Sequence, residues 1–388
     1  MDNYEPLSLE KERVLMGLID WIKQKLKTPT YSQKSTIQNN CENQESLFKI
    51  EFSIDRSIPE INKIYTKKLD IGLLPGEIVL LDWINGKEAD SSFPQYFRYD
   101  YGIDAETSMK KLVYEDYLRL STPMESLKYM KVDSLKQILR DNSLKVSGNK
   151  QELIDRIIAN FTESELDNFS KMRTRRYILT NKGKEVFNTY YYIIPAHRYS
   201  SKDGIYNVAT AIDFVSKHNN YPTNHEIAWS LFTEAEENNR VSHKYGLFRN
   251  VKLHKAVHLQ RQNNIEHALN HCLEVFIIDL SGLGNGLYLN SPSLINSAPA
   301  IKSYINSYIE TLDMNEEILK KKFSKVWDSL TPQLPFHLLD KNSCLNCLLA
   351  FLNDNEEYIE KEIESTFDRI DKKTFTKKYN LRLPHNLD

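Results

Sequence analysis

The chain has 388 residues, and its 51 Lys and Arg nearly balance its 53 Asp and Glu, for a net charge of −2 at neutral pH. Hydrophobic residues make up 40% of it, which excludes a disordered chain, and the length suggests roughly two or three domains. With only 12 Gly and 13 Pro, the sequence favours helices over an all-β architecture with many turns. Because the balanced charge excludes a general polyanion binder, contact with a nucleic acid requires a local basic patch.

The sequence also favours a reducing compartment. Four cysteines are too few and too unevenly spaced for a disulfide framework: Cys41, Cys272, Cys344 and Cys347. The acidic N-terminal residues do not resemble a secretory signal, and apolar runs such as 275–280 are too short to span a bilayer. We therefore expect a cytoplasmic protein without membrane contact.

The first 120 residues are predicted to be largely helical. Apolar periodicity and capping residues predict three helices, over 9–27, over 75–84 and over 104–114. The first helix and the polar linker after it form an N-terminal segment, 1–47. Asp104 is a good N-cap for the third helix, and residues 115–121 form an extended exit from it.

A second extended segment is predicted near residue 177. The run Tyr177-Ile-Leu-Thr-Asn-Lys-Gly-Lys-Glu185 leads from a strand through a glycine turn into a helix. This pattern resembles the wing and final helix of winged-helix proteins, and the helices before residue 120 fit the earlier half of such a domain. The resemblance implies a winged-helix-like domain made of 48–123 and 171–200, with 124–170 inserted between the two strands of its wing.

The inserted segment begins with a short amphipathic helix. Leu135, Ile138 and Leu139 form its buried stripe. The spacing of Ser134 and Gln137 predicts a capping box at its start.

A second amphipathic helix follows after an extended link. Gly148 permits a tight turn, and Asn149 with Glu152 can cap the second helix. Further apolar residues are expected to complete the small core: Leu144, Val146, Leu153, Ile154, Ile157 and Ile158.

These two helices resemble the SAP family. Its members share a Leu-Lys-x-x-Leu first helix, a Ser-Gly-x-Lys loop and a Glu-Leu-Ile-x-Arg second helix, which here begin at Leu135, Ser147 and Glu152. The resemblance implies a helix–extended–helix module that binds double-stranded DNA with little sequence preference, favouring AT-rich tracts, although some members act as protein docking modules. Further motifs at 74–78 and 279–282 resemble SAP-domain proteins of low-GC Gram-positive bacteria and their phages.

The resemblance also implies which residues contact phosphate. Carried over by position, they are Lys136, Arg140, Lys145, Gly148, Asn149 and Lys150. A helix N-terminus offers free backbone N–H groups to a phosphate, and a lysine beside it adds a full charge. The segment 171–184 carries six Lys and Arg without an acidic residue. This basic wing is predicted to extend the surface through Arg173, Arg175, Arg176 and Lys182, unless both runs are only solvated surface charge.

The C-terminal domain, 201–388, is predicted to be helical throughout. Helices are expected over 206–218, 223–239, 300–312, 315–329, 342–353 and 354–370, with a helical hairpin over 244–280. Small side chains at Ala256, Ala268 and Cys272 make this hairpin similar to a tetratricopeptide unit, although the Trp and closing Pro of that pattern are absent. Cys344 and Cys347 lie in an apolar helix, where buried cysteines are ordinary.

Histidines recur in this domain at helical spacing. His254 and His258 are four residues apart, as are His267 and His271, so two pairs could face each other around a metal in an antiparallel hairpin. The Lys, Gln and Asn residues around them favour solvated histidines instead. We expect neither a metal nor another cofactor.

Enzyme signatures are absent from the sequence. There is no Walker loop, nucleophile elbow or kinase motif. The glycines at 282, 284 and 286 follow a predicted helix, whereas a dinucleotide-binding loop follows a strand. His218 and His225, each beside asparagine, have only a faint similarity to an HNH nuclease.

The fold expected is therefore mainly α: a winged-helix-like domain with an inserted SAP module, 124–170, and a C-terminal tetratricopeptide-like helical domain. The leading hypothesis is a non-enzymatic DNA-binding protein, regulatory or architectural, whose C-terminal domain binds an unidentified protein partner or a second copy. One alternative is a protein–protein interaction scaffold of phage or bacterial origin, acting in or against host defence. Another is a metal-dependent enzyme with a site among the C-terminal histidines.

Overall fold

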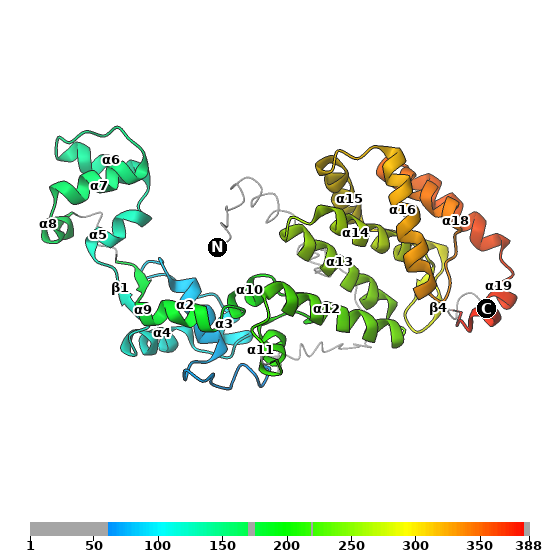
Figure 1. Ribbon diagram of the computed structural model, residues 1–388, viewed down its shortest axis with the longest axis horizontal. Helices are drawn as coiled ribbons and strands as arrows, with labels where there is room; N and C mark the ends of the chain where they lie inside the picture. Colours follow the sequence, from blue (N-terminus) through cyan, green and yellow to red (C-terminus); the bar gives the residue numbers. More distant parts are fainter. Residues whose placement is uncertain (1–60, 170–174, 219, 384–388) are drawn as a thin grey trace, which may run out of the picture. The chain divides into compact units, whose positions relative to one another are not determined.

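The computed structural model describes residues 61–169, 175–218 and 220–383, all within one compact unit, Ile58–Asp388 (Figure 1). The helix expected over 9–27 lies outside the described residues, as does Arg173. The described part is mainly helical, as the composition predicted.

The segments on either side of the insertion share one core. Their elements are α2 (Pro75–Ile84), α3 (Tyr96–Tyr99), α4 (Ala105–Tyr114), β1 (Leu118–Leu120), β2 (Tyr177–Leu179), α9 (Asn181–Thr189) and α10 (Ile193–Arg198). Strands β1 and β2 pair antiparallel, with Leu118 opposite Leu179. Asp104 caps α4 by accepting the N–H of Thr107, as predicted. Buried Glu77 of α2 accepts hydrogen bonds from Lys111 of α4, which ties the two helices together.

Gly183 has a packing role that differs from the one predicted. It lies inside α9 rather than in a turn, and a Cβ atom there would come within 2.2 Å of the carbonyl oxygen of Tyr117. Thr180 caps the helix instead, by accepting the N–H of Gly183. Glycine therefore permits α9 to approach the backbone just before β1.

The insertion between β1 and β2 has a core of its own. Its elements are α5 (Pro123–Ser126), the 3₁₀ turn η1 (Leu127–Tyr129), α6 (Val132–Asp141), α7 (Lys150–Asn160) and α8 (Glu163–Asn168). The core joins the buried residues Leu127, Leu135, Ile138, Leu139, Leu153, Ile154, Ile157 and Leu166. Leu144 and Val146 pack against it as predicted, whereas Ile158 is 44% exposed because it points away from α6.

The C-terminal half is a stack of helices. They are α11 (Val208–Ser216), α12 (Asn224–Val241), α13 (Tyr245–Arg261), α14 (Ile265–Asp279), α15 (Pro299–Thr311), α16 (Glu316–Leu330), α17 (Lys341–Leu352), α18 (Glu356–Arg369) and α19 (Lys372–Tyr379), with short turns η3 (Pro292–Leu294) and η4 (Thr331–Gln333). Helix α13 packs on both α12 and α14 (Figure 1). The predicted hairpin over 244–280 is confirmed, with Asn263 in a left-handed conformation at its turn.

The glycine run after α14 forms a small hairpin. Strands β3 (Leu283–Gly284) and β4 (Tyr288–Leu289) pair antiparallel, and Gly286 has a φ of +70° in the turn between them. Cys272, Cys344 and Cys347 are buried free thiols, as expected for cysteines in apolar helices.

Candidate nucleic-acid interface

Helices α6 and α7 of the insertion are capped differently. Helix α6 begins at Val132, with Lys131 at the N-cap and no side-chain cap. The capping box predicted from Ser134 and Gln137 is therefore wrong, because the helix begins two residues before Ser134. Helix α7 follows the prediction: the side chain of Asn149 accepts the N–H of Glu152 at 3.0 Å.

The loop before α7 is held in a defined shape by side chains of α7 itself. Gly148 has a φ of +128°, a conformation that side-chain-bearing residues rarely adopt, and the Glu152 carboxylate accepts the N–H of Asn149 at 3.2 Å. Arg156 of α7 donates to the carbonyl oxygens of Lys145 and Ser147, at 2.5 and 3.1 Å. Sequence reasoning missed this role of Arg156, although the arginine is part of the Glu-Leu-Ile-x-Arg motif.

The loop places a group of exposed lysines around the start of α7. Lys145 and Lys150 are exposed, and the Nζ atom of Lys150 donates to the carbonyl oxygen of Lys128 at 2.7 Å. That bond brings the start of α7 beside Lys128, which is exposed, as is Lys131 at the N-cap of α6. Neither lysine was among the residues predicted to contact phosphate, although both contribute to the positive charge of the inserted segment.

The two contact residues predicted on α6 lie one helical turn apart. Lys136 is half-buried and forms no ion pair within the described part of the chain. Arg140 is exposed and donates to the side-chain oxygen of Gln137 at 2.8 Å. Both cations therefore keep donors for a ligand.

The central part of the insertion is moderately positive, although the acids at 125, 163, 165 and 167 give the whole insertion, 124–170, a net charge of 7 − 8 = −1. Between residues 126 and 162 there are seven Lys and Arg and four Asp and Glu, so the net charge is 7 − 4 = +3. Glu152 is used in the cap of α7, and Asp141 and Asp155 accept hydrogen bonds from glutamines of their own helices.

Two arginines of the predicted basic wing, Arg175 and Arg176, are engaged within the protein. Arg175 donates to Asp167 of α8 at 2.7 Å and to the carbonyl oxygen of Ser121. Arg176 pairs with Glu88 at 2.5 Å and also donates to a backbone carbonyl, that of Gly86. These bonds hold the strand β2 against its neighbours and against the insertion, a role that the sequence did not indicate.

Two other cations near the strands have similar contacts. Lys182 donates to the carbonyl oxygen of Glu115 at 2.7 Å and lies 3.9 Å from the ring centre of Tyr117. Arg119 of β1 makes two hydrogen bonds to Glu125 of α5, and this pairing lowers the pKa of Glu125 to about 2. Arg119, Arg175 and Arg176 are therefore paired with acids, whereas Lys182 is held by a backbone carbonyl and an aromatic ring.

The insertion contains a SAP domain. A family model described as SAP domain matches residues 126–162. This range contains α6, the loop and α7, and it includes the buried core residues of the insertion except Leu166. Neither the curated proteins nor the solved structures contain a match to the chain. SAP domains are generally DNA-binding modules, so this domain is compatible with DNA binding.

The C-terminal histidines are mostly bonded to other side chains. His254 lies 2.9 Å from Asp203, and the Nε2 atom of His258 lies 2.9 Å from the Nδ1 atom of His225. His258 is only 8% exposed, and burial lowers its pKa to about 4. The expectation of solvated histidines is therefore wrong for His258.

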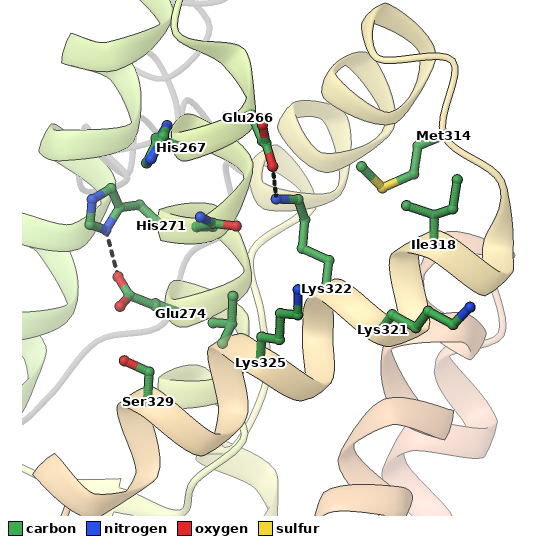
Figure 2. A pocket seen from close by; sticks show the side chains of 12 residues that line it. Glu266, His267, His271, Glu274, Met314, Ile318, Lys321, Lys322, Lys325 and Ser329 are labelled. Atoms are coloured by element: carbon green, nitrogen blue, oxygen red, sulfur yellow. Dashed lines mark hydrogen bonds and ion pairs between the residues drawn. The ribbon is translucent and has the colours of Figure 1, made fainter.

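The second predicted pair, His267 and His271, belongs to one face of α14. His267 bonds to the side chain of Asn264, whereas His271 bonds through Nδ1 to Glu274 at 2.5 Å (Figure 2). Within the described ranges, no three His, Cys, Asp or Glu side chains are grouped so that they could hold a metal ion. No helix in those ranges is both long and apolar enough to cross a membrane.

A network of buried charged side chains connects α12, α13 and α14. Lys252 of α13, with a side chain 4% exposed, pairs with Glu236 of α12 at 2.7 Å and with Glu274 of α14 at 3.2 Å. Lys255 pairs with Glu236 as well, at 2.5 Å. Burial raises the pKa of each carboxyl, but the neighbouring cations more than offset it, and both pKa values lie below the ordinary range. The network joins three helices through two lysines and two glutamates.

Proposed function

We propose that the protein binds double-stranded DNA through its SAP domain, in a regulatory or architectural role without catalysis. The observation that carries this proposal is the SAP match at 126–162 on a segment with its own core and a rigid, lysine-bearing loop. Affinity would come from phosphate contacts, which neutralise backbone charge and release counterions. Such contacts carry little sequence information, in keeping with a preference for AT-rich DNA set by its shape.

The contact surface in this proposal is centred on the start of α7. Lys145 and Lys150 flank the loop, and the first N–H groups of α7 point out of the helix toward a bound phosphate. Lys136 and Arg140 of α6 extend the surface, and the exposed lysines at 128 and 131 add to it. The charge of +3 supports low-affinity, salt-sensitive binding rather than tight, sequence-specific binding.

The segments on either side of the SAP domain and the C-terminal helices would have supporting roles. The antiparallel pairing of β1 with β2, with α9 after it, supports a winged-helix-like domain that carries the SAP domain in its wing. Arg175 and Arg176 would then position the SAP domain through Asp167 and Glu88 instead of contacting phosphate first. The C-terminal stack, with its tetratricopeptide-like hairpin, would bind a protein partner or a second copy. A cytoplasmic setting in a low-GC Gram-positive bacterium or its phage completes the proposal.

Binding to short fluorescent duplexes tests the proposal. Anisotropy titrations of a mixed-sequence and an AT-rich duplex, each at low and at physiological salt, are expected to give dissociation constants of about micromolar at low salt. The triple variant Lys136→Ala/Lys145→Ala/Lys150→Ala should lose most of this binding.

A control with the same change in net charge separates local from general electrostatics. Lys217→Ala/Lys320→Ala/Lys361→Ala removes three exposed lysines that lie in other helices and each pair with an acid one turn away. This control should bind as the parent does. Equal binding by the two triple variants, or no binding of either duplex at low salt, would refute the proposal and direct the search to a protein partner of the SAP domain.

A further inference from the structure

A cavity of about 600 Å³ lies between α14 and α16 (Figure 2). One wall consists of His267 and His271 of α14, and the other carries Lys322 and Lys325 of α16. In Figure 2 both lysine side chains reach from α16 toward α14, while Lys321 extends away from them and pairs with Glu317. The cavity therefore brings two ammonium groups and two imidazoles to one space.

The acidic groups of this cavity are already paired. Glu266 accepts from Lys322 at 3.0 Å, and Glu274 accepts from both His271 and the buried Lys252. Lys325 forms no ion pair within the ranges that the structure describes. Because the Nδ1 atom of His271 donates to the Glu274 carboxylate, the Nε2 atom of the neutral ring is a hydrogen-bond acceptor. The donors that remain for an incoming molecule are the ammonium groups of Lys322 and Lys325, which suit a phosphate.

A second cavity, of about 430 Å³, shares His267 and His271 with the first. It is lined by the indole of Trp229 and the imidazole of His225, which lie nearly parallel, 23° apart with ring centres separated by 5.8 Å. The side-chain amides of Gln262 and Asn264 also line it, and an amide offers both donors and an acceptor. Flat aromatic rings with amides beside them suit a planar heterocycle that carries hydrogen-bonding groups.

We propose that these two cavities form a nucleotide-binding site, in which Lys322 and Lys325 bind the phosphates and the subsite at Trp229 binds the base. A free phosphate would leave the aromatic cavity without a role, and an uncharged heterocycle would leave the lysines without one. A ligand that has both a phosphate and a base would occupy both cavities. Its sugar would lie beside His267 and His271, which line both of them. The proposal does not depend on DNA binding, because every residue in it lies between α12 and α16.

Calorimetric titration of the full chain with AMP and ATP tests this site. Both nucleotides should bind at submillimolar concentrations, and ATP should bind more tightly because it presents more phosphate charge. Lys325→Ala should weaken ATP binding roughly tenfold, the effect of one lost charge-assisted hydrogen bond. Lys320→Ala, on the same helix but outside the cavity lining, should leave it unchanged.

Three further titrations separate the parts of the ligand. Pyrophosphate and adenosine should each bind more weakly than ATP, and Trp229→Ala should weaken ATP binding while it leaves pyrophosphate binding near the parent value. No binding of ATP at millimolar concentration would overturn the proposal. So would equal affinity for pyrophosphate and ATP, or an ATP affinity that Lys325→Ala does not change. Circular dichroism of each variant confirms that it is folded, and unchanged duplex binding shows that the SAP domain is unaffected.

Discussion

Removing the charge of Lys252 is expected to destabilise the helices α12, α13 and α14 strongly. The ammonium lies between the carboxylates of Glu236 and Glu274, on two different helices, and its side chain is only 4% exposed. The two lysines and two glutamates of the network carry a net charge of zero. The substitution Lys252→Met keeps the aliphatic stem and leaves a net charge of −1 in a buried environment.

The size of the expected loss of stability depends on the cationic partner that each carboxylate retains. Breaking a buried ion pair by removing one partner costs about 3–5 kcal/mol. Glu236 retains Lys255 and Glu274 retains His271, so the expected loss lies near the lower limit, about 3 kcal/mol. The double variant Lys252→Met/Glu274→Gln restores neutrality and should lose less than the sum of the two single variants.

Urea unfolding followed by circular dichroism measures these changes. Lys361→Met is a matched control, because Lys361 is 72% exposed and pairs only with Glu357 one turn away. It should unfold close to the parent. If Lys252→Met also unfolds close to the parent, or if the losses in the double variant simply add, then the network does not link the three helices as described.

Three further changes test other parts of the structure. Gly148→Ala should lower the stability of the SAP domain by about 1–2 kcal/mol and weaken duplex binding. The reason is that a Cβ atom would lie 2.3 Å from Oε2 of Glu152 and disturb the cap of α7. Thermal unfolding measures the loss of stability. Gly183→Ala should destabilise the domain around α9 by about 1–3 kcal/mol, because its Cβ atom meets the backbone of Tyr117; an unchanged melting temperature would argue against that close approach. The pKa of His258 falls from 6.5 to about 4 on folding, so between these pH values the unfolded chain binds a proton that the folded chain does not. The free energy of unfolding should therefore decrease by about 3 kcal/mol as the pH decreases from 6.5 to 4. His258→Gln should flatten this dependence.

The parts of the fold that follow local patterns could be predicted from the sequence. The stripe of Leu135, Ile138 and Leu139 and the cap at Asn149 lie within a few residues of one another, so their spacing determines both helices of the SAP domain. The hairpin over 244–280 was predictable for the same reason. Local spacing failed at the start of α6, where Ser134 and Gln137 fit a capping box but the helix continues back to Val132.

The contacts that depend on distant segments could not be predicted in this way. Arg175 was predicted to contact phosphate because it lies in a basic run, but its partner Asp167 belongs to a separate helix. His258 has polar neighbours in sequence, yet it is buried because α12 places His225 against it. Charge counted along a sequence does not distinguish a cation that faces solvent from one that pairs across the fold.

The salt dependence of duplex binding tests the central proposal most directly. If Lys136, Lys145 and Lys150 each neutralise one phosphate, the slope of log K against log salt for the parent should be about −2.7 or steeper. The triple alanine variant should lose about 0.9 from the magnitude of that slope for each lysine removed, while the control that removes Lys217, Lys320 and Lys361 keeps the parent slope. A slope near zero for the parent, or the same slope for the parent and the SAP variant, would contradict DNA binding through this domain.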